Sequence, residues 1–295
     1  MWIATTISEA RQRRKAVRGR VAFVATMGAL HEGHLSLMRR ADELADHVIV
    51  SIFVNPGQFG PGEDYERYPR CLDEDLAHCR RRELTGVFCP TVEEMYPAGQ
   101  FECDVNIPPL AESLEGEHRP NHFTGVCRVV LKLLNVLTPD MTCFGQKDYQ
   151  QLRIVEAMCR DLNVPVALVT CPTVRDEDGL ALSSRNKMLG PEEQCHALGL
   201  YKALREAEML VQEDGEEDPG IVEGAMRRVM EAHRIQVDYA VVRHPRSMAK
   251  LDRIHSDHGG IVALVAGRVG RVRLIDNALI GGEERLLELI GGDEQ

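Results

Sequence analysis

Two histidines three residues apart, His31 and His34, are the side chains of this sequence best placed to bind phosphate. They follow an apolar run at 21–25 and precede apolar residues at helical spacing, namely Leu35, Leu37, Met38 and Ala41. This pattern predicts a strand, a tight turn and the start of a helix. Backbone N–H groups at a helix start bind phosphate oxygens, and the helix dipole favours their charge. The segment therefore predicts nucleotide chemistry.

The same spacing also occurs in surface pairs and in zinc sites. Zinc proteases of the His-Glu-x-x-His kind place their histidines four apart within a helix, whereas these are three apart. Gly33, between the two histidines, lets a ligand approach the backbone. Open α/β sheets also bind ligands where a strand passes into a helix. We therefore favour phosphate over zinc.

Two polar segments offer groups for a second, smaller substrate. Asn55 and Gln58 follow the apolar run 47–54, and their neutral amides suit a small hydroxy acid, although the segment could simply form a loop. Arg119 and its neighbours precede a long helical pattern. Arg119 or His122 could meet an anion there, while capping of the helix by Asn121 or Thr124 is an equal alternative.

Two cationic segments are candidates for the phosphates themselves. Lys147 follows a strand and Gly145 and precedes a helix, so its ammonium would face an anion at the helix start. Asp148 beside it has the alternative of a residue favoured by the helix dipole. The loop 178–187 carries Ser-Ser-Arg and a further lysine, which can hold a triphosphate through charge-assisted hydrogen bonds or form a polar hinge.

Three acidic residues, Asp73, Glu74 and Asp75, stand at the start of another predicted helix. They could bind Mg²⁺, or they could only favour the helix N-terminus. Of the three, we take Asp75 as the magnesium candidate.

The composition predicts a globular protein with a mainly aliphatic core. Apolar residues make up 44% of the 295 residues and aromatic residues 5%. The net charge of -11 argues against general binding to nucleic acid or to anionic membranes. The nine cysteines show no metal-ligand spacing, and no run reaches signal-peptide or transmembrane length. We therefore expect reduced thiols in a cytoplasmic protein.

Strand-like and helix-like segments alternate through the first part of the chain. Strands are predicted at 21–25, 47–54, 86–89, 141–144 and 164–170, with helices between them, which indicates a parallel sheet covered by helices. After Thr173 a polar loop leads to helices at 191–212 and 220–233. Strands near 237–243, 261–266 and 269–276 follow them. We predict a domain at 1–174 and a smaller α+β domain at 175–295.

These segments together resemble the pantothenate synthetases, the pantoate–β-alanine ligases of coenzyme A biosynthesis. The matching motifs stand in family order and span residues 26 to 186, at 26–34, 51–60 with 68–70, 119–125, 144–152 and 178–186. The resemblance implies a Rossmann-like domain of the His-x-Gly-His nucleotidyltransferase type that binds ATP and pantoate. It further implies a C-terminal lid domain, Mg²⁺ with ATP, no tightly bound organic cofactor, and a homodimer.

The resemblance also implies a reaction in two steps. The carboxylate of (R)-pantoate attacks the α-phosphorus of ATP, which gives pantoyl adenylate and pyrophosphate. The amine of β-alanine then attacks that mixed anhydride and releases pantothenate and AMP.

Carried onto this chain, the resemblance assigns roles residue by residue. His34, as the proton donor, and His31 contact the nucleotide phosphates, and Lys147 stabilises the charge that develops on them. Ser183, Ser184 and Arg185 hold the β- and γ-phosphates. The wider ATP site is expected to include Met27, Gly28, Gly145, Gln146, Asp148, Val174 and Leu182. The substrate site is expected to include Gln58, Gln151, Asn55, Met27 and Arg119.

Three positions depart from the family pattern. Ala25 stands where proline is usual, Gly57 replaces a usual methionine, and Gln146 replaces a usual glutamate. None of them removes a phosphate-binding cation or a pantoate-binding glutamine, so we expect any effect to fall on substrate affinity and not on reaction type. The alternatives are another nucleotidyltransferase of this superfamily with a phosphorylated acceptor, or a non-catalytic nucleotide-binding protein.

Overall fold

The computed structural model describes residues 1–97, 103–255 and 259–282, which fold into two compact units. The first unit holds Met1–Gly145 and Gln150–Cys171. The second holds Gln146–Tyr149 together with the described residues from Pro172 to Gly282. The short segment after Gly145, which the sequence assigns to the first domain, is thus associated with the second unit.

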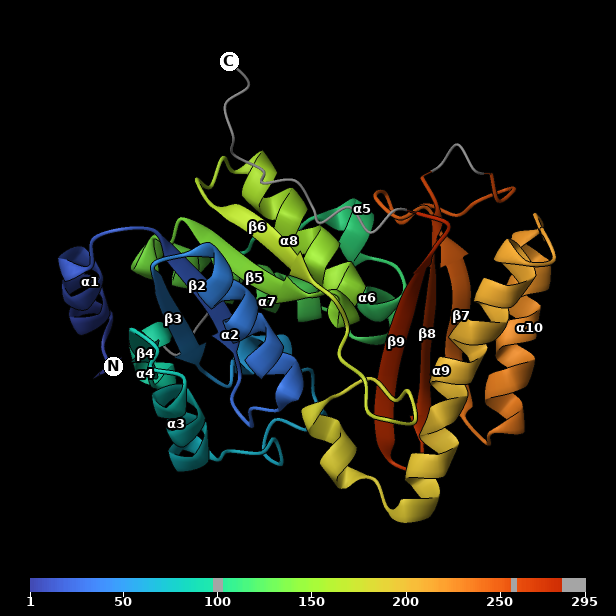
Figure 1. The fold of residues 1–295 in the computed structure, drawn as a ribbon, viewed down its shortest axis with the longest axis horizontal. Helices are drawn as coiled ribbons and strands as arrows, with labels where there is room; N and C mark the ends of the chain where they lie inside the picture. The colour runs from blue at the N-terminus through green and yellow to red at the C-terminus, as the bar shows by residue number, and fades with distance from the viewer. Residues whose placement is uncertain (98–102, 256–258, 283–295) are drawn as a thin grey trace. The chain divides into compact units, whose positions relative to one another are not determined.

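The first unit is built on a six-stranded sheet in the order β1-β4-β3-β2-β5-β6 (Figure 1). All its pairs are parallel, and the strands are β1 (Trp2–Ala4), β2 (Val21–Thr26), β3 (His47–Ile52), β4 (Gly86–Phe88), β5 (Met141–Gly145) and β6 (Ala167–Cys171). Strand β2 lies between β3 and β5, so the strand order reverses there. In open α/β sheets this switch point is where ligands bind, beyond the carboxyl ends of the strands.

Helices cover this sheet because its strands are apolar on both faces. Ala22 and Val24 of β2 pack with helix α2, whereas Phe23 between them points to the other face and is equally buried. The helices of the first unit are α1 (Ile7–Ala16), α2 (Glu32–Leu44), η1 (Pro56–Gln58), α3 (Leu72–Arg81), α4 (Val92–Met95), α5 (Pro108–Ala111), α6 (Glu115–His118), α7 (His122–Leu137) and α8 (Tyr149–Asp161), which begins at the unit boundary.

The second unit is a three-stranded antiparallel sheet in the order β7-β8-β9, with two long helices against it (Figure 1). Its elements are η2 (Gln146–Asp148), η3 (Ser184–Met188), α9 (Pro191–Gln212), α10 (Pro219–Ala232), β7 (Gln236–Arg243), β8 (Ile261–Val269) and β9 (Val272–Ile280). Leu200 and Leu204 of α9 and Met226 of α10 share one core with Val265 of β8.

The predicted fold class is confirmed: a parallel sheet flanked by helices is followed by a smaller α+β part. The sequence prediction missed β1, α1 and the short helices α4, α5 and α6. Strand β1 has three residues and α1 carries several charges, so neither shows a clear apolar period.

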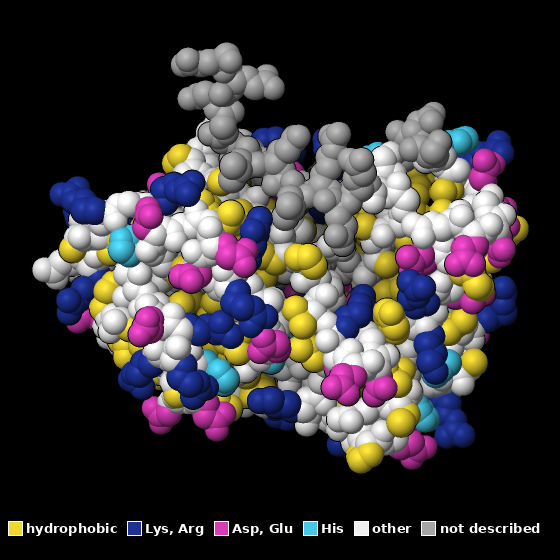
Figure 2. Space-filling model, viewed as in Figure 1, with side chains coloured by type: hydrophobic (Ala, Val, Ile, Leu, Met, Phe, Trp, Pro, Cys, Tyr) yellow, Lys and Arg dark blue, Asp and Glu magenta, His cyan; other side chains and the backbone are white. Residues whose placement is uncertain are grey.

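The surface is mixed in charge. Figure 2 shows basic and acidic side chains interspersed over the visible face, as a chain with 35 cationic and 46 acidic residues allows. Within the part of the chain that the structure describes, no helix is long and apolar enough to cross a membrane.

Candidate active site

The turn after β2 is held in an unusual backbone shape by a buried carboxylate. Gly28 and Ala29 both have positive φ, at 81° and 51°. Asp75 of α3 accepts hydrogen bonds from the backbone N–H groups of Ala29 at 2.9 Å and Leu30 at 2.7 Å. A Cβ at Gly28 would stand 2.8 Å from Asp75 Oδ2, so this position requires glycine for space as well as for φ.

In this geometry Asp75 holds the turn, which is a role other than the predicted binding of magnesium. The residue is only 2% exposed, and each of its carboxylate oxygens accepts one of the two turn N–H groups. Among the described residues, no group of three or more His, Cys, Asp or Glu side chains is placed to hold a metal ion. The structure therefore supports a positioning role for Asp75, and its metal role stays a prediction.

The two histidines cap helix α2 reciprocally. His31 is the N-cap residue and its Nδ1 accepts the N–H of Gly33 at 3.2 Å, while Nδ1 of His34 accepts the N–H of His31 at 3.4 Å. Their ring centroids lie 4.1 Å apart. Because Nδ1 is the acceptor in both rings, each neutral imidazole carries its proton on Nε2. Both side chains are half-buried at the carboxyl end of β2, as a pair of N–H donors for an anion requires.

The predicted substrate residues Asn55 and Gln58 form one hydrogen-bonded turn. Asn55 is 1% exposed and donates from Nδ2 to Oε1 of Gln58 at 3.1 Å, while its Oδ1 accepts the hydroxyl of Tyr96 at 2.8 Å. The other end of the Gln58 carboxamide lies 3.1 Å from the sulfur of Met27. The Gln58 side chain thus has one fixed orientation, next to the turn that carries the histidines.

A second layer fixes the backbone of Gln58. Its carbonyl oxygen lies 2.8 Å from Nδ1 of His122 and 3.3 Å from Nη2 of Arg119. Arg119 Nη1 lies 3.1 Å from His122 Nε2. An arginine can only donate and a carbonyl can only accept, so His122 carries its proton on Nδ1 and is neutral. Burial, and then the charge of Arg119, lower the pKa of His122 to about 4.

The guanidinium of Arg119 is largely occupied within this layer. It contacts both carboxylate oxygens of Glu63, at 2.8 Å from Nε and 2.7 Å from Nη2. Burial raises the pKa of Glu63, but the hydrogen bonds and charge of Arg119 outweigh it, so that the pKa lies below its usual value. These contacts support a positioning role for Arg119, and the substrate contact predicted for it stays a prediction.

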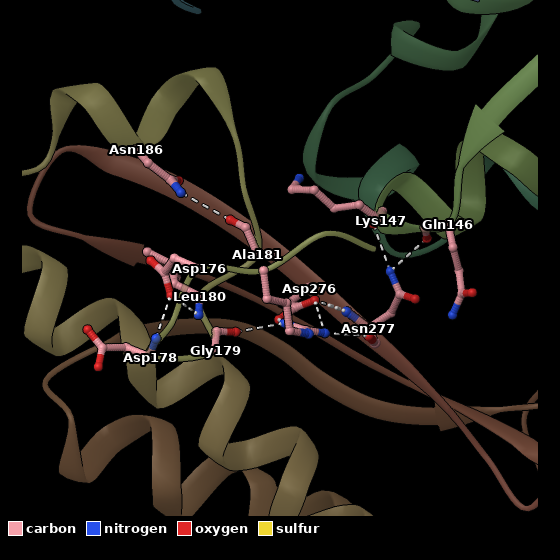
Figure 3. Close-up of polar contacts among 11 residues, drawn as sticks. Gln146, Lys147, Asp176, Asp178, Gly179, Leu180, Ala181, Asn186, Asp276 and Asn277 are labelled. Carbon is pink, nitrogen blue, oxygen red and sulfur yellow. Dashed lines mark hydrogen bonds and ion pairs between the residues drawn. The ribbon is translucent and has the colours of Figure 1, made fainter. Parts of the chain in front are cut away.

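In the second unit, Lys147 stands on η2 and its backbone is held by strand β9. Nδ2 of Asn277 donates to the carbonyl oxygens of Gln146 at 3.0 Å and of Lys147 at 2.7 Å (Figure 3). The ammonium of Lys147 lies 3.5 Å from the half-exposed carboxylate of Asp148. A partly exposed ion pair at this distance contributes little to stability, and the phosphate contact expected for Lys147 stays a prediction.

The loop that carries Ser183, Ser184 and Arg185 is closed by its own backbone. A bridge pairs Arg175 with Ala181, and the N–H of Leu182 donates to the carbonyl of Val174 at 2.9 Å. Ser183 then caps η3, because its Oγ accepts the N–H of Arg185 at 3.3 Å. The loop thus carries the hydroxyls of Ser183 and Ser184 and the guanidinium of Arg185 on one short helical turn.

The predicted residues fall into two groups, one in each unit. Gly145 ends β5, and Gln151 is half-buried in the first turn of α8. The first unit holds Met27, Gly28, His31, His34, Asn55, Gln58, Asp75, Arg119, Gly145 and Gln151. The second unit holds Gln146, Lys147, Asp148, Val174, Leu182, Ser183, Ser184 and Arg185.

The sequence prediction missed the residues that hold these groups in place. They are Glu63, Tyr96, Arg175, Asp276 and Asn277, together with the positioning roles of Asp75 and His122. One signal was present: Asp276 and Asn277 interrupt a strand that is otherwise rich in apolar residues, and both are nearly fully buried. Buried polar side chains need partners, so such a pair indicates a structural connection.

Comparisons with known proteins show which family the chain belongs to. A family model described as pantoate-beta-alanine ligase matches residues 2–279. A pantothenate synthetase of Roseiflexus castenholzii is 47% identical over 281 residues, which cover 95% of this chain and 99% of that protein. The crystal structure of the Thermus thermophilus pantothenate synthetase is 44% identical, with a TM-score of 0.89 over 94% of this chain and 99% of that one.

A further solved structure contains ligands. The pantoate-beta-alanine ligase of Francisella tularensis, described as complexed with beta-gamma ATP and beta-alanine, is 33% identical, with a TM-score of 0.79. It matches over 95% of this chain and 97% of its own. A match of this extent in both sequence and structure shows the family. The chain belongs to the pantoate–β-alanine ligase family.

Proposed function

We propose that this protein condenses (R)-pantoate with β-alanine at the expense of ATP, through a pantoyl-adenylate intermediate. In the first step a carboxylate oxygen of pantoate forms a bond to the α-phosphorus. The bond between the α-phosphorus and the oxygen that bridges it to the β-phosphorus breaks, which releases pyrophosphate. In the second step the amine of β-alanine bonds to the acyl carbon. The acyl C–O bond breaks, AMP leaves, and the amine nitrogen loses a proton to give the amide of pantothenate.

The observation that carries this proposal is the reciprocal capping of α2 by His31 and His34. It presents two Nε2–H donors at the carboxyl end of β2, where negative charge on a transferring phosphate needs stabilisation. The acceptor role of Nδ1 makes His34 a donor from Nε2. No enzyme nucleophile is required, because the substrate carboxylate attacks.

The remaining residues position the reactants and offset the repulsion between two anions. Gln58, whose carboxamide is fixed by Asn55 and Met27, supports neutral recognition of pantoate, and Gln151 is proposed to join it. Lys147 and the Ser183–Arg185 turn would take the β- and γ-phosphates of ATP. Neutral amides suit a hydroxy acid better than a phosphorylated acceptor, which favours this reaction over other nucleotidyl transfers.

The proposal also covers the metal ion that accompanies ATP, the oligomeric state of the protein and its compartment. ATP would enter with Mg²⁺, whose charge offsets that of the phosphates. We also expect a homodimer in the cytoplasm. All nine cysteines are free thiols, which suits a reducing compartment. Light scattering on the purified protein would measure the oligomeric state.

The test is product formation by the purified protein with all three substrates. We expect AMP, pyrophosphate and pantothenate in equal amounts in the steady state. AMP and pantothenate require all three substrates, whereas a single turnover of pyrophosphate release requires only ATP and pantoate. Phosphorylated acceptors replace pantoate in a parallel series. Pyrophosphate release with one of those acceptors but not with pantoate would establish a different nucleotidyltransferase. ATP binding without turnover would indicate a non-catalytic protein.

A further inference from the structure

We propose that Asn277 is a positioning residue for Lys147, and that the adjoining residue pair Asp276–Asn277 on β9 anchors both phosphate-binding segments of the second unit. This inference rests on the proposed function, which places Lys147 and the Ser183–Arg185 turn on the phosphates of ATP. The proposal concerns a strand remote in sequence from every motif that indicates the chemistry.

The contact between Asn277 and η2 uses both hydrogens of one amide. Nδ2 donates to the consecutive carbonyl oxygens of Gln146 and Lys147, at 3.0 and 2.7 Å. Figure 3 shows the Asn277 side chain directed at this short segment. Asn277 is 2% exposed, so removal of its amide would leave these carbonyls without their buried donor. Two bonds from one nitrogen fix the orientation of two consecutive peptide units as well as their position.

The neighbouring residue Asp276 holds the other segment. Its carboxylate contacts both terminal nitrogens of Arg175, at 2.5 and 3.0 Å, and is almost fully buried. Arg175 also donates to the carbonyl of Gly179 at 3.1 Å and to that of Asn277 at 3.3 Å. Its guanidinium lies over the ring of Tyr201, 4.8 Å from the centroid. A planar guanidinium with this many partners has one available orientation.

Contacts within the loop beyond Arg175 connect this arginine to the phosphate-binding turn. Arg175 pairs with Ala181 across the loop, and Nδ2 of Asn186 donates to the carbonyl of Ala181 at 3.0 Å (Figure 3). Asp176 closes the tip, because its Oδ1 accepts the N–H groups of Asp178 and Leu180. Two adjacent residues of β9 therefore hold the backbone at Lys147 and the start of the loop that leads to the Ser183–Arg185 turn.

The consequence for catalysis is specific to one half-reaction. Lys147 would act while charge develops on the departing pyrophosphate, so its placement affects adenylate formation and not the later attack by β-alanine. Misplacement of a catalytic group by about 1 Å can lower a rate by about a hundredfold. Loss of the Asn277 donors is expected to slow adenylate formation at least about tenfold, because part of the η2 geometry remains.

The experiment compares two variants of nearly equal size, Asn277→Asp and Asn277→Leu, with a control on the same strand. Both variants remove the amide donors, and only the first adds a carboxylate, so a shared effect belongs to the donors. Arg273→Gln is the control, because Arg273 also lies on β9 and the substitution removes its 2.6 Å contact with Asp238 on β7. Single-turnover formation of pantoyl adenylate is measured with ATP and pantoate, and reaction of preformed adenylate with β-alanine is measured separately.

We expect adenylate formation to fall at least about tenfold in both Asn277 variants, while the β-alanine step and both steps of Arg273→Gln change less than about twofold. Introducing Asn277→Leu into a Lys147→Ala protein should then cost less than about twofold, because the group that it positions is gone. Circular dichroism and thermal unfolding identify any variant that does not fold. If one Asn277 variant does not fold, the other is compared with the control.

Equal slowing of both half-reactions, or an undiminished loss in the Lys147→Ala protein, would show that Asn277 only stabilises the fold and would overturn the inference. So would normal adenylate formation in both Asn277 variants. These outcomes differ from failure of the proposed function, in which the unsubstituted enzyme forms no pantoyl adenylate at all; that result would overturn the function and this inference together.

Discussion

At the scale of single residues, the proposed chemistry depends on which ring nitrogen carries the proton. His31 and His34 each use Nδ1 to cap helix α2, which leaves the proton of the neutral ring on Nε2. His122 has the opposite tautomer, because its Nδ1 donates to the carbonyl of Gln58. Spacing in the sequence predicts the pair at 31 and 34, whereas the tautomers follow only from the hydrogen-bond partners.

Replacement of His34 by alanine tests the donor role. His34→Ala removes a donor to the transferring phosphate, and the turnover is expected to fall at least about a hundredfold, as for loss of one oxyanion donor. The matched control is His196→Ala on α9, a half-buried histidine of the second unit whose contact with the exposed Glu192 is a weak one at 3.7 Å. Steady-state AMP release measures both, and near-normal turnover of a folded His34→Ala protein would contradict the role.

The neutral state of His122 predicts a dependence of stability on pH. Its pKa is about 4 in the folded protein, below the value of 6.5 for the unfolded chain, so the unfolded state binds the proton more readily. This contribution to stability is complete above pH 6.5 and is lost as the pH falls from 6.5 toward 4. Between pH 7 and pH 5 the loss amounts to about 2 kcal/mol for this group.

Urea unfolding of the native protein and of His122→Gln measures that contribution. Other groups titrate in the same range, so the quantity of interest is the difference between the two proteins. We expect the native protein to lose about 2 kcal/mol more than the variant between pH 7 and pH 5. Parallel pH profiles for the two proteins would show that His122 is not held neutral.

At the scale of elements, close backbone contact positions the substrate turn. The N-terminal part of α7 packs so tightly on η1 that a Cβ on Gly125 would stand 1.8 Å from the carbonyl oxygen of Gly57. The carbonyl of Gly125 also accepts a hydrogen bond from Asn55 at 3.1 Å. Glycine in a helix is normally unfavourable, so its presence here indicates a contact that no side chain permits.

Gly125→Ala is expected to displace η1 and with it Gln58. We predict a KM for pantoate raised at least about tenfold and a loss of about 1–3 kcal/mol in the free energy of unfolding, as for other overpacked sites. Gly224→Ala in α10 is the matched control, because its Cβ would meet only the flexible end of Arg228 at 3.4 Å. There the substitution should be neutral or stabilising by up to about 1 kcal/mol. An unchanged KM in Gly125→Ala would contradict the packing argument.

The elements differ in how well the sequence predicts them. Helix α2 was predicted from four apolar positions, and all four are buried in the structure. The boundaries of α9 were predicted correctly because proline stands at its start and the apolar period is long. Strand β1 and helix α1 were missed because a three-residue strand has no period and α1 has a weakly apolar face. Length and periodicity decide what sequence patterns can predict.

At the scale of the whole molecule, composition and motif order predict the class of protein, while long-range contacts decide how its site is held. The net charge of -11 coexists with cations gathered in short motifs, such as Lys147 and Arg185, that suit an anionic substrate. The connections from Asp75 to Ala29 and from Asn277 to Lys147 join residues 46 and 130 positions apart. Spacing within a motif contains no information about such partners, which explains why they were missed.

The most direct test of the central claim is to follow the carboxylate oxygens of pantoate. Pantoate labelled with ¹⁸O in its carboxylate is incubated with ATP, Mg²⁺, β-alanine and the enzyme, and the nucleotide and phosphate products are analysed by mass spectrometry. If the carboxylate attacks the α-phosphorus, cleavage of the acyl C–O bond leaves one labelled oxygen on AMP and none on pyrophosphate. Unlabelled AMP, or label in inorganic phosphate released with ADP, would contradict the adenylate mechanism.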